Sequence, residues 1–147
     1  MATRFSLRGP AWLTDRAAFG AAYRAAIRAP LDSLATTIKG QAVSAYSGTR
    51  FAAGFTYRTA VSPYTELRLF QRDPLFPYVE YPTRPHLIVP RAGGWLRWVA
   101  GGSAHFARTV HHPGTKGRNV IDPILAAAAP RFAAIVTAAV QEAATRG

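Results

Sequence analysis

Four histidines, with one carboxylate close to them in sequence, are the side chains whose types could support metal or acid–base chemistry: His86, His105, His111, His112 and Glu80. His111 and His112 are adjacent, so on a strand they point to opposite faces, and neither stands in an H-E-x-x-H spacing. The pattern favours a structural or turn-stabilising role. A metal-dependent enzyme that uses His105, His111 or His112 is the remote alternative. Because Arg84 is near Glu80, we expect a structural ion pair there.

Two tryptophans and an arginine alternate in the run Trp95-Leu96-Arg97-Trp98. Interleaved aromatic and arginine side chains can stack on the bases of single-stranded nucleic acid. On a strand, Trp95 and Arg97 would share one face, and Leu96 and Trp98 the other. We therefore expect one tryptophan in the core and the other at a protein interface, where Trp and Arg are enriched.

The chain is strongly basic, with a formal charge of +11 that arises from 18 Lys and Arg residues against 7 Asp and Glu. Between Tyr81 and Ile121 there is no acid, and the six basic residues are Arg84, Arg91, Arg97, Arg108, Lys116 and Arg118. Such an excess indicates an anionic partner, either nucleic acid or an acidic protein face. GC-rich coding also produces an Ala- and Arg-rich composition. A freestanding nucleic-acid-binding protein for DNA packaging or regulation is therefore one candidate function.

Composition excludes several classes of chemistry. The sequence has no cysteine, which removes disulfides, zinc–thiolate sites and thiol catalysis. It has no Walker-type loop, no G-x-S-x-G and no G-x-G-x-x-G, so we expect no cofactor and no catalytic residue. No continuous apolar segment near the N-terminus predicts a signal peptide, and Pro130 and Arg131 interrupt the Ala-rich C-terminal segment, so no membrane association is expected.

The elements that would position these residues follow from periodicity. A helix is expected over 14–38, capped by Thr14 or Asp15, broken near Pro30 and stopped at Gly40. Residues 41–60 alternate like a hairpin, and a third strand is expected over 65–70. Residues 1–13 would form an N-terminal arm.

In the second half of the sequence, five prolines predict a stiff loop over 73–90, with one helical turn near 76–81. Strands over 95–100 and 104–110 would be joined at Gly101-Gly102-Ser103. A last helix over 122–144, with Asp122 as its N-cap and a kink at Pro130, would pack on one face of the sheet. The sequence therefore predicts a single α+β domain over 1–147, with an N-terminal helix, about four to five antiparallel strands and a C-terminal helix.

Three short motifs in this order carry a resemblance. They consist of Val79, Glu80, Thr83, Pro85 and His86, then Val110, His112, Pro113, Gly114 and Thr115, then Pro123 and Leu125. A weaker match lies upstream at 29–38. This arrangement resembles the small neck proteins of long-tailed bacteriophages and related gene-transfer particles, which join the DNA-filled head to the tail. Pro82 stands where that family has glycine.

The resemblance implies a structural virion protein, not an enzyme, that is made in the host cytoplasm and assembles as a closed homo-oligomeric ring, most simply a hexamer. Its partners would be adjacent neck proteins (portal adaptor, stopper, tail terminator or tail tube), with possible contact to genomic DNA in the lumen. The candidate interface residues are Arg72, Tyr78, Glu80, Arg84, His86, Arg91, Trp95, Arg97, Arg108, His112, Lys116 and Arg118.

Overall fold

The computed structural model describes residues 3–9 and 17–146, and the chain divides into two compact units. Unit 1 comprises residues 1–77 and 119–147, and unit 2 comprises residues 78–118. An N-terminal helix, antiparallel strands and a C-terminal helix confirm the expected α+β class. The assignment of 1–147 to a single domain stays a prediction.

Unit 1 is built on a three-stranded antiparallel sheet with the strand order β1–β3–β2. Its strands are β1 (Thr3–Arg8), β2 (Phe55–Ala60) and β3 (Glu66–Gln71). Residues directly opposite each other share a face of the sheet. Leu69 lies opposite Phe5 on one face, whereas Arg68 lies opposite Arg58 on the other. Phe5 and Leu69 are buried, so the first face is the apolar one.

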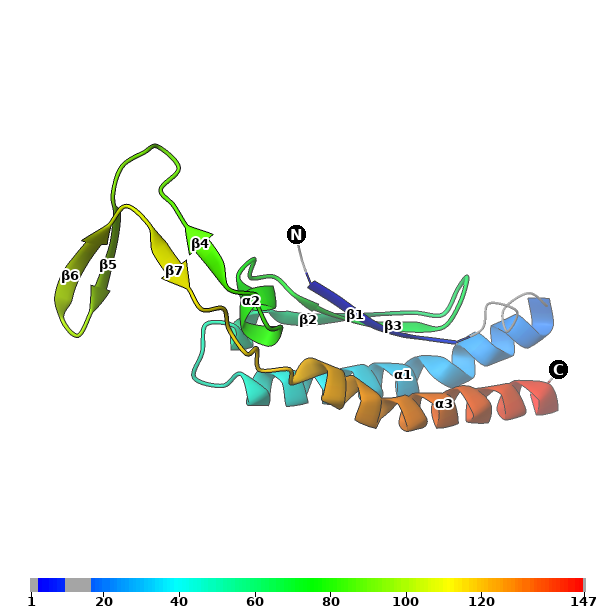
Figure 1. Ribbon diagram of the computed structural model, residues 1–147. Helices are drawn as coiled ribbons and strands as arrows, with labels where there is room; N and C mark the ends of the chain where they lie inside the picture. Colours follow the sequence, from blue (N-terminus) through cyan, green and yellow to red (C-terminus); the bar gives the residue numbers. More distant parts are fainter. Residues whose placement is uncertain (1–2, 10–16, 147) are drawn as a thin grey trace. The chain divides into compact units, whose positions relative to one another are not determined.

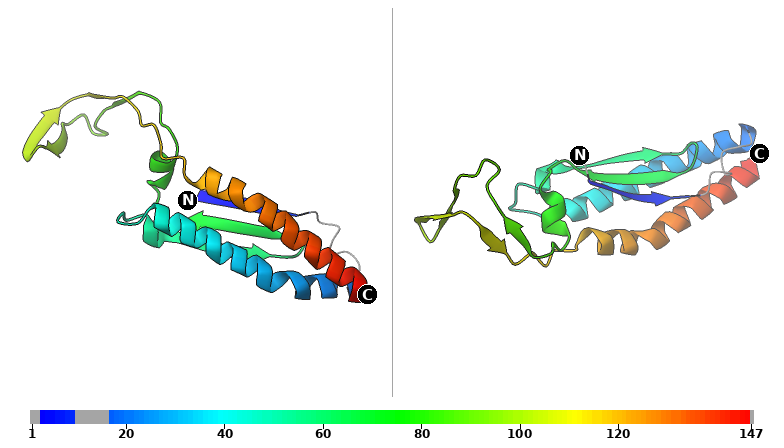
Figure 2. Two further views of the ribbon diagram at one scale, coloured as in Figure 1. Left: turned by 90° about the horizontal axis from the view of Figure 1, so that it is seen from below. Right: turned by 45° about the horizontal axis from the view of Figure 1, so that its top comes forward.

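Two long helices cover that apolar face, α1 (Ala17–Ala45) and α3 (Ile121–Arg146), and they lie side by side (Figures 1 and 2). The buried stripe of α1 recurs at helical spacing, as an amphipathic helix requires: Tyr23, Ile27, Leu31, Leu34 and Ile38. The face that α3 buries is made largely of small residues, which let the two helices approach closely: Ala128, Phe132, Ala139 and Ala143.

The expected break near Pro30 is wrong, because α1 continues through it as far as Ala45. Pro30 lies on the exposed side of the helix, where water can bond to the carbonyl that proline leaves without a donor. Gly40, also exposed, does not stop the helix either. In the same way α3 continues past the exposed Pro130, and it begins one residue before Asp122.

Two further expectations for the N-terminal half are wrong. The supposed strand over 43–47 belongs to α1 and the turn after it, because the buried stripe continues from Ile38 to Ala42 and Tyr46. The supposed N-terminal arm contains β1, which pairs with β3 in the sheet. The proposed cap at Thr14 or Asp15 lies outside the described residues.

An aromatic cluster closes one end of unit 1. The ring of Phe76 lies 5.1 Å from that of Tyr46, 5.8 Å from that of Phe51 and 5.4 Å from that of Phe55. Three of these four side chains are fully buried, so the cluster holds the end of α1 against β2 and against the start of α2 (Phe76–Glu80). The helical turn expected near 76–81 is confirmed as α2.

Unit 2 contains two short antiparallel ribbons. The first pairs β4 (His86–Ile88) with β7 (Val110–His112), and the second pairs β5 (Leu96–Ala100) with β6 (Ser103–Ala107). Gly101 and Gly102 join β5 to β6 with positive φ at both positions, which confirms the predicted glycine turn. The seven strands of the described residues therefore form three small sheets instead of one.

By length and composition α3 would qualify as a membrane span, and most of its apolar stretch is exposed. A core helix of a soluble protein satisfies the same test. The buried face of α3 packs on α1.

Candidate interaction surface

The first two motifs that carry the resemblance pair with each other in unit 2. Thr83 and Thr115 exchange backbone hydrogen bonds, with N···O distances of 3.0 and 3.2 Å. Their hydroxyl oxygens are 3.1 Å apart, and the Thr115 hydroxyl also donates to the carbonyl of Tyr78. The Arg118 N–H donates to the carbonyl of Val79 at 2.8 Å. We refer to this paired region, residues 78–90 and 110–118, as the β4–β7 module.

Glycine is required in the second motif because two backbones meet there. Gly114 has φ +83°, and a Cβ at that position would overlap the carbonyl of Thr83. The N–H of Gly114 donates to Nδ1 of His112 at 3.1 Å, which fixes this histidine as an acceptor at that atom. The segment His112–Thr115 therefore brings the two motifs together.

Three of the four histidine rings stack on another ring. The rings of His86 and His112 stack at 5.0 Å, and Nδ1 of His86 donates to the carbonyl of Arg84. His105 stacks on Trp98 at 5.5 Å in the other ribbon. Within residues 3–9 and 17–146, no group of three or more His, Asp or Glu side chains could hold a metal ion. The contacts seen are structural ones.

An open hollow of about 570 Å³ lies on the β4–β7 module and is lined mainly by apolar surface. Four of the expected interface residues line it: Tyr78, Arg84, His86 and His112. Glu80, by contrast, is fully buried, so its carboxylate lies inside the unit and is not available to a partner. Arg118, Arg91 and Lys116 lie on the exposed surface of unit 2.

The β5–β6 hairpin, defined here as residues 95–108, exposes apolar side chains on both faces. Trp95, Val99 and Phe106 are 58–62% exposed, and Arg108 lies over the ring of Trp95 at 5.1 Å. The predicted split of the tryptophans between two faces agrees with the register, but the prediction that one is in the core is wrong. Trp98 is 41% exposed and Trp95 is 61% exposed.

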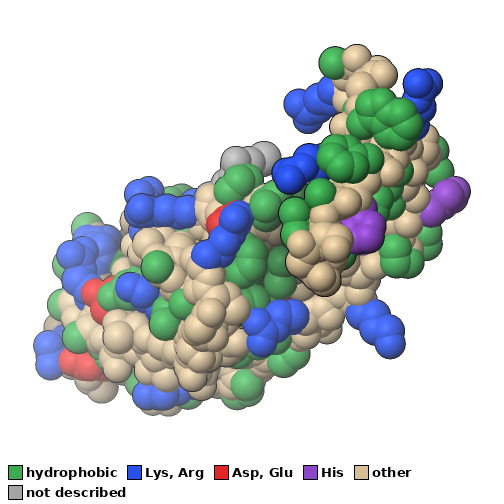
Figure 3. All heavy atoms as spheres, turned by 90° about the vertical axis from the view of Figure 1, so that its left-hand side faces the viewer, with side chains coloured by type: hydrophobic (Ala, Val, Ile, Leu, Met, Phe, Trp, Pro, Cys, Tyr) green, Lys and Arg blue, Asp and Glu red, His purple; other side chains and the backbone are tan. Residues whose placement is uncertain are grey.

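Unit 2 is also basic throughout its surface. It holds six Lys and Arg residues, and its single acid, Glu80, is buried. All four histidines lie in unit 2, and Figure 3 shows hydrophobic and Lys or Arg side chains interspersed on the surface around them. Exposed aromatic anchors mixed with arginines are the composition of a protein–protein interface.

Arg72 is the one expected interface residue that lies in unit 1, and there it joins a set of arginines that sequence reasoning missed. Arg4, Arg8, Arg58 and Arg68 occupy the outer face of the β1–β3–β2 sheet. Their alternation with apolar residues in β1 and β3 was the available signal. We refer to these four residues with Arg72 as the arginine face.

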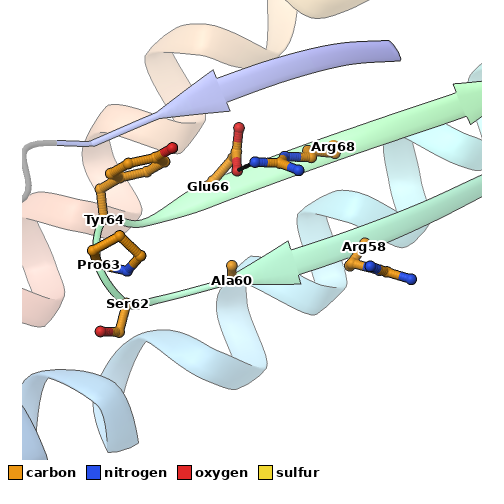
Figure 4. A pocket seen from close by; sticks show the side chains of 7 residues that line it. All are labelled: Arg58, Ala60, Ser62, Pro63, Tyr64, Glu66 and Arg68. Carbon is orange, nitrogen blue, oxygen red and sulfur yellow. Dashed lines mark ion pairs between the residues drawn. The ribbon is translucent and has the colours of Figure 1, made fainter. Parts of the chain in front are cut away.

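Glu66 lies among these arginines, and Figure 4 shows it beside Arg68. Its side chain is only 2% exposed. It accepts from Nε of Arg8 and from Nη2 of Arg68, both at 2.5 Å. Burial raises the pKa of the Glu66 carboxyl, but hydrogen bonds and charge from Arg68 and Arg8 outweigh this and hold its pKa below the ordinary 4.5.

We therefore expect acid to destabilise unit 1. A carboxyl whose pKa is lowered by folding stabilises the fold above its unfolded pKa, and this stability is lost as pH falls through the folded value, which lies below 4.5. Glu66→Gln should reduce the free energy of unfolding at pH 7 by about 1–2 kcal/mol, discounted because both arginines reach solvent. It should also flatten the acid limb of stability against pH in denaturant titrations. The matched control Glu142→Gln, in an exposed pair with Arg146, should change neither.

Comparison with protein-family models, with curated proteins and with solved structures finds no match to this chain. The structure therefore defines the fold class of this protein and no family. This is an α+β protein whose second unit carries an exposed hairpin with two arginines, Arg97 and Arg108.

Proposed function

We propose that this chain is a structural subunit of a phage neck, assembling as a ring, most simply a hexamer, that joins the head to the tail and helps to complete the tail. The observation that carries the proposal is the β5–β6 hairpin. A two-stranded ribbon is at best marginally stable in water, and this one leaves large apolar side chains exposed on both faces. A second chain that covers the ribbon would remove the free-energy cost of exposing these apolar side chains to water.

Repetition of one such contact builds a ring. If the hairpin of one subunit binds a different surface of the next, the contact is heterologous, and it closes when the rotation between subunits divides a full turn. The pairing of the two resemblance motifs adds support, because Thr83 and Thr115 stand in the motif positions that the resemblance assigns. The charge of unit 2 suits an acidic face on an adjoining ring of the neck.

The proposal predicts that assembly depends on the apolar anchors of the hairpin. Val99→Ser combined with Phe106→Ser removes two exposed side chains and should convert a ring of defined stoichiometry into monomers, as measured by native mass spectrometry. At a concentration too low for assembly, the variant and the wild type should have similar thermal midpoints, because both side chains are exposed in the single chain. The control Leu75→Ser, an equally exposed apolar residue of unit 1, should still form rings.

Two results would contradict the ring. One is a wild-type chain that stays monomeric at every soluble concentration. The other is a double variant that still assembles with wild-type stoichiometry, which would show that the hairpin is not the contact.

A further inference from the structure

The outer face of the β1–β3–β2 sheet presents a cluster of positive charge that the ring contact does not use. Arg4, Arg58 and Arg72 are exposed, and none has an ion-pair partner among the described residues. Arg58 lies directly opposite Arg68 across β2 and β3. Along a strand, alternate residues are about 6.8 Å apart, so the guanidinium groups are spread over the sheet instead of gathered at one point.

Little on this face neutralises the charge. Among the described residues Glu66 is the one carboxylate on this face, and Arg8 and Arg68 already share it. Asp73, next to Arg72 in sequence, is bound to Arg50 at 2.8 Å. Like charges directly opposite each other in a sheet are destabilising, as Arg58 and Arg68 are here. An external anion would relieve this repulsion.

The chemistry of the face distinguishes between anionic partners. A protein interface needs large apolar anchors, and none of the exposed large hydrophobic side chains of the described residues lies on the arginine face. Most residues between the arginines are small or polar, among them Ser6, Thr56 and Ala60, and the one large apolar residue, Phe70, is half-buried. An acidic protein partner would find charge here but little apolar surface to pack against.

The face also lacks a platform for stacking bases. Phe70 is half-buried, and the ring of Tyr64 is covered by the guanidinium of Arg8 at 4.8 Å. Single-stranded nucleic acid is bound mainly through exposed aromatic rings, whereas a duplex can be held through its phosphates alone. Two shallow hollows of about 120 and 340 Å³, which share Arg58, provide concave places beside the guanidinium groups.

We infer that the arginine face binds the phosphodiester backbone of duplex DNA, without reading its sequence. Arg4, Arg58 and Arg72 donate to phosphate oxygens, and Glu66 holds Arg8 and Arg68 in place beside them. The inference goes beyond the ring proposal and does not depend on it, because the face lies wholly within unit 1. In a ring, the contacts of several subunits would add through effective concentration.

The test is fluorescence anisotropy of a short labelled duplex with the full chain, between about 50 and 200 mM salt. The triple variant Arg4→Gln, Arg58→Gln, Arg72→Gln spares the two arginines that hold Glu66, so the fold is kept. Each phosphate contact contributes about 0.9 to the slope of log affinity against log salt, so the slope should fall by about 3 and the affinity at low salt by about tenfold or more.

The matched control is Arg24→Gln, Arg28→Gln, Arg131→Gln, which removes the same charge from α1 and α3 on the other side of the sheet. It should keep most of the affinity and slope. Equal losses in the two triple variants would overturn the inference, since net charge alone would then explain binding. Tighter binding of the wild-type chain to a single strand than to the duplex would overturn the inference as well. So would a triple variant of the arginine face that loses binding to polyglutamate, a probe for an acidic protein, but still binds the duplex.

The two proposals fail separately. A Val99→Ser/Phe106→Ser chain that is monomeric yet keeps its salt-dependent DNA binding supports both. A chain that never forms a ring but binds duplex through the arginine face supports this inference, and it moves the function to a freestanding DNA-binding protein. A ring that ignores DNA at low salt overturns this inference alone.

Discussion

Replacement of Phe76 by alanine should reduce the free energy of unfolding of unit 1 by about 3–5 kcal/mol, the usual cost of removing a fully buried phenylalanine. Phe76 is 0% exposed and contacts three other rings within 5.8 Å. Its loss would leave a cavity that Tyr46 and Phe55 cannot fill, because the end of α1 and β2 hold them in place. Equilibrium unfolding in urea, followed by far-UV circular dichroism, measures the change.

The adjacent residue supplies the control for this prediction. Leu75 is 50% exposed, so Leu75→Ala removes a side chain of similar size from the surface and should cost less than about 0.5 kcal/mol. If the two alanine variants unfold at the same urea concentration, the aromatic cluster is not a core, and the burial of Phe76 within unit 1 is wrong.

Replacement of Gly114 by alanine should open the β4–β7 module. The residue would be forced to keep a positive φ, and its Cβ would overlap a backbone carbonyl that cannot move without breaking the pairing of Thr83 with Thr115. A cost of about 2–4 kcal/mol is expected, enough to unfold a module with so little buried surface. Amide hydrogen exchange at Thr83, Thr115 and Arg118 should rise towards unprotected rates.

The variant Gly102→Ala separates the two sources of that cost, which are the positive φ and the overlap of the new Cβ with a carbonyl. Gly102 has nearly the same φ, +79°, but nothing lies within 4 Å of the Cβ it would gain. Its alanine variant should lose only about 1 kcal/mol, confined to the β5–β6 hairpin. Similar exchange patterns in the two variants would show that backbone strain alone, and not the close approach of the two motifs, sets the stability of the module.

Local periodicity predicted the long helices and the glycine turn between β5 and β6, because their signals lie within a few residues. The signal failed between residues 41 and 47. There Val43, Ala45 and Ser47 fit a strand, but Ala42 and Tyr46 also continue a helical stripe. Packing of Tyr46 against Phe55 and Phe76 favours the helix, and those residues are distant in sequence.

β1 could not be recognised from its own residues, because its partner β3 lies about sixty residues later in the chain. The arginine face was lost with it: once Thr3–Arg8 is known to be a strand, the alternation of Arg4, Ser6 and Arg8 predicts that they share a face. For the tryptophans, the alternation of side chains along a strand predicted which residues share a face of the hairpin. It did not predict whether another part of the structure covers that face. Burial depends on a third layer of structure, which no local pattern contains.

Most strands of this protein have a free edge. Among the described strands only β3 is paired on both sides, so six others each leave one line of backbone N–H and C=O groups open. Such lines are templates for unwanted pairing between copies, and like charges on the same strands normally keep copies apart. Salt shortens the reach of that repulsion to about 10 Å at 0.1 M. A high-salt wash of this protein should therefore also weaken its protection against aggregation.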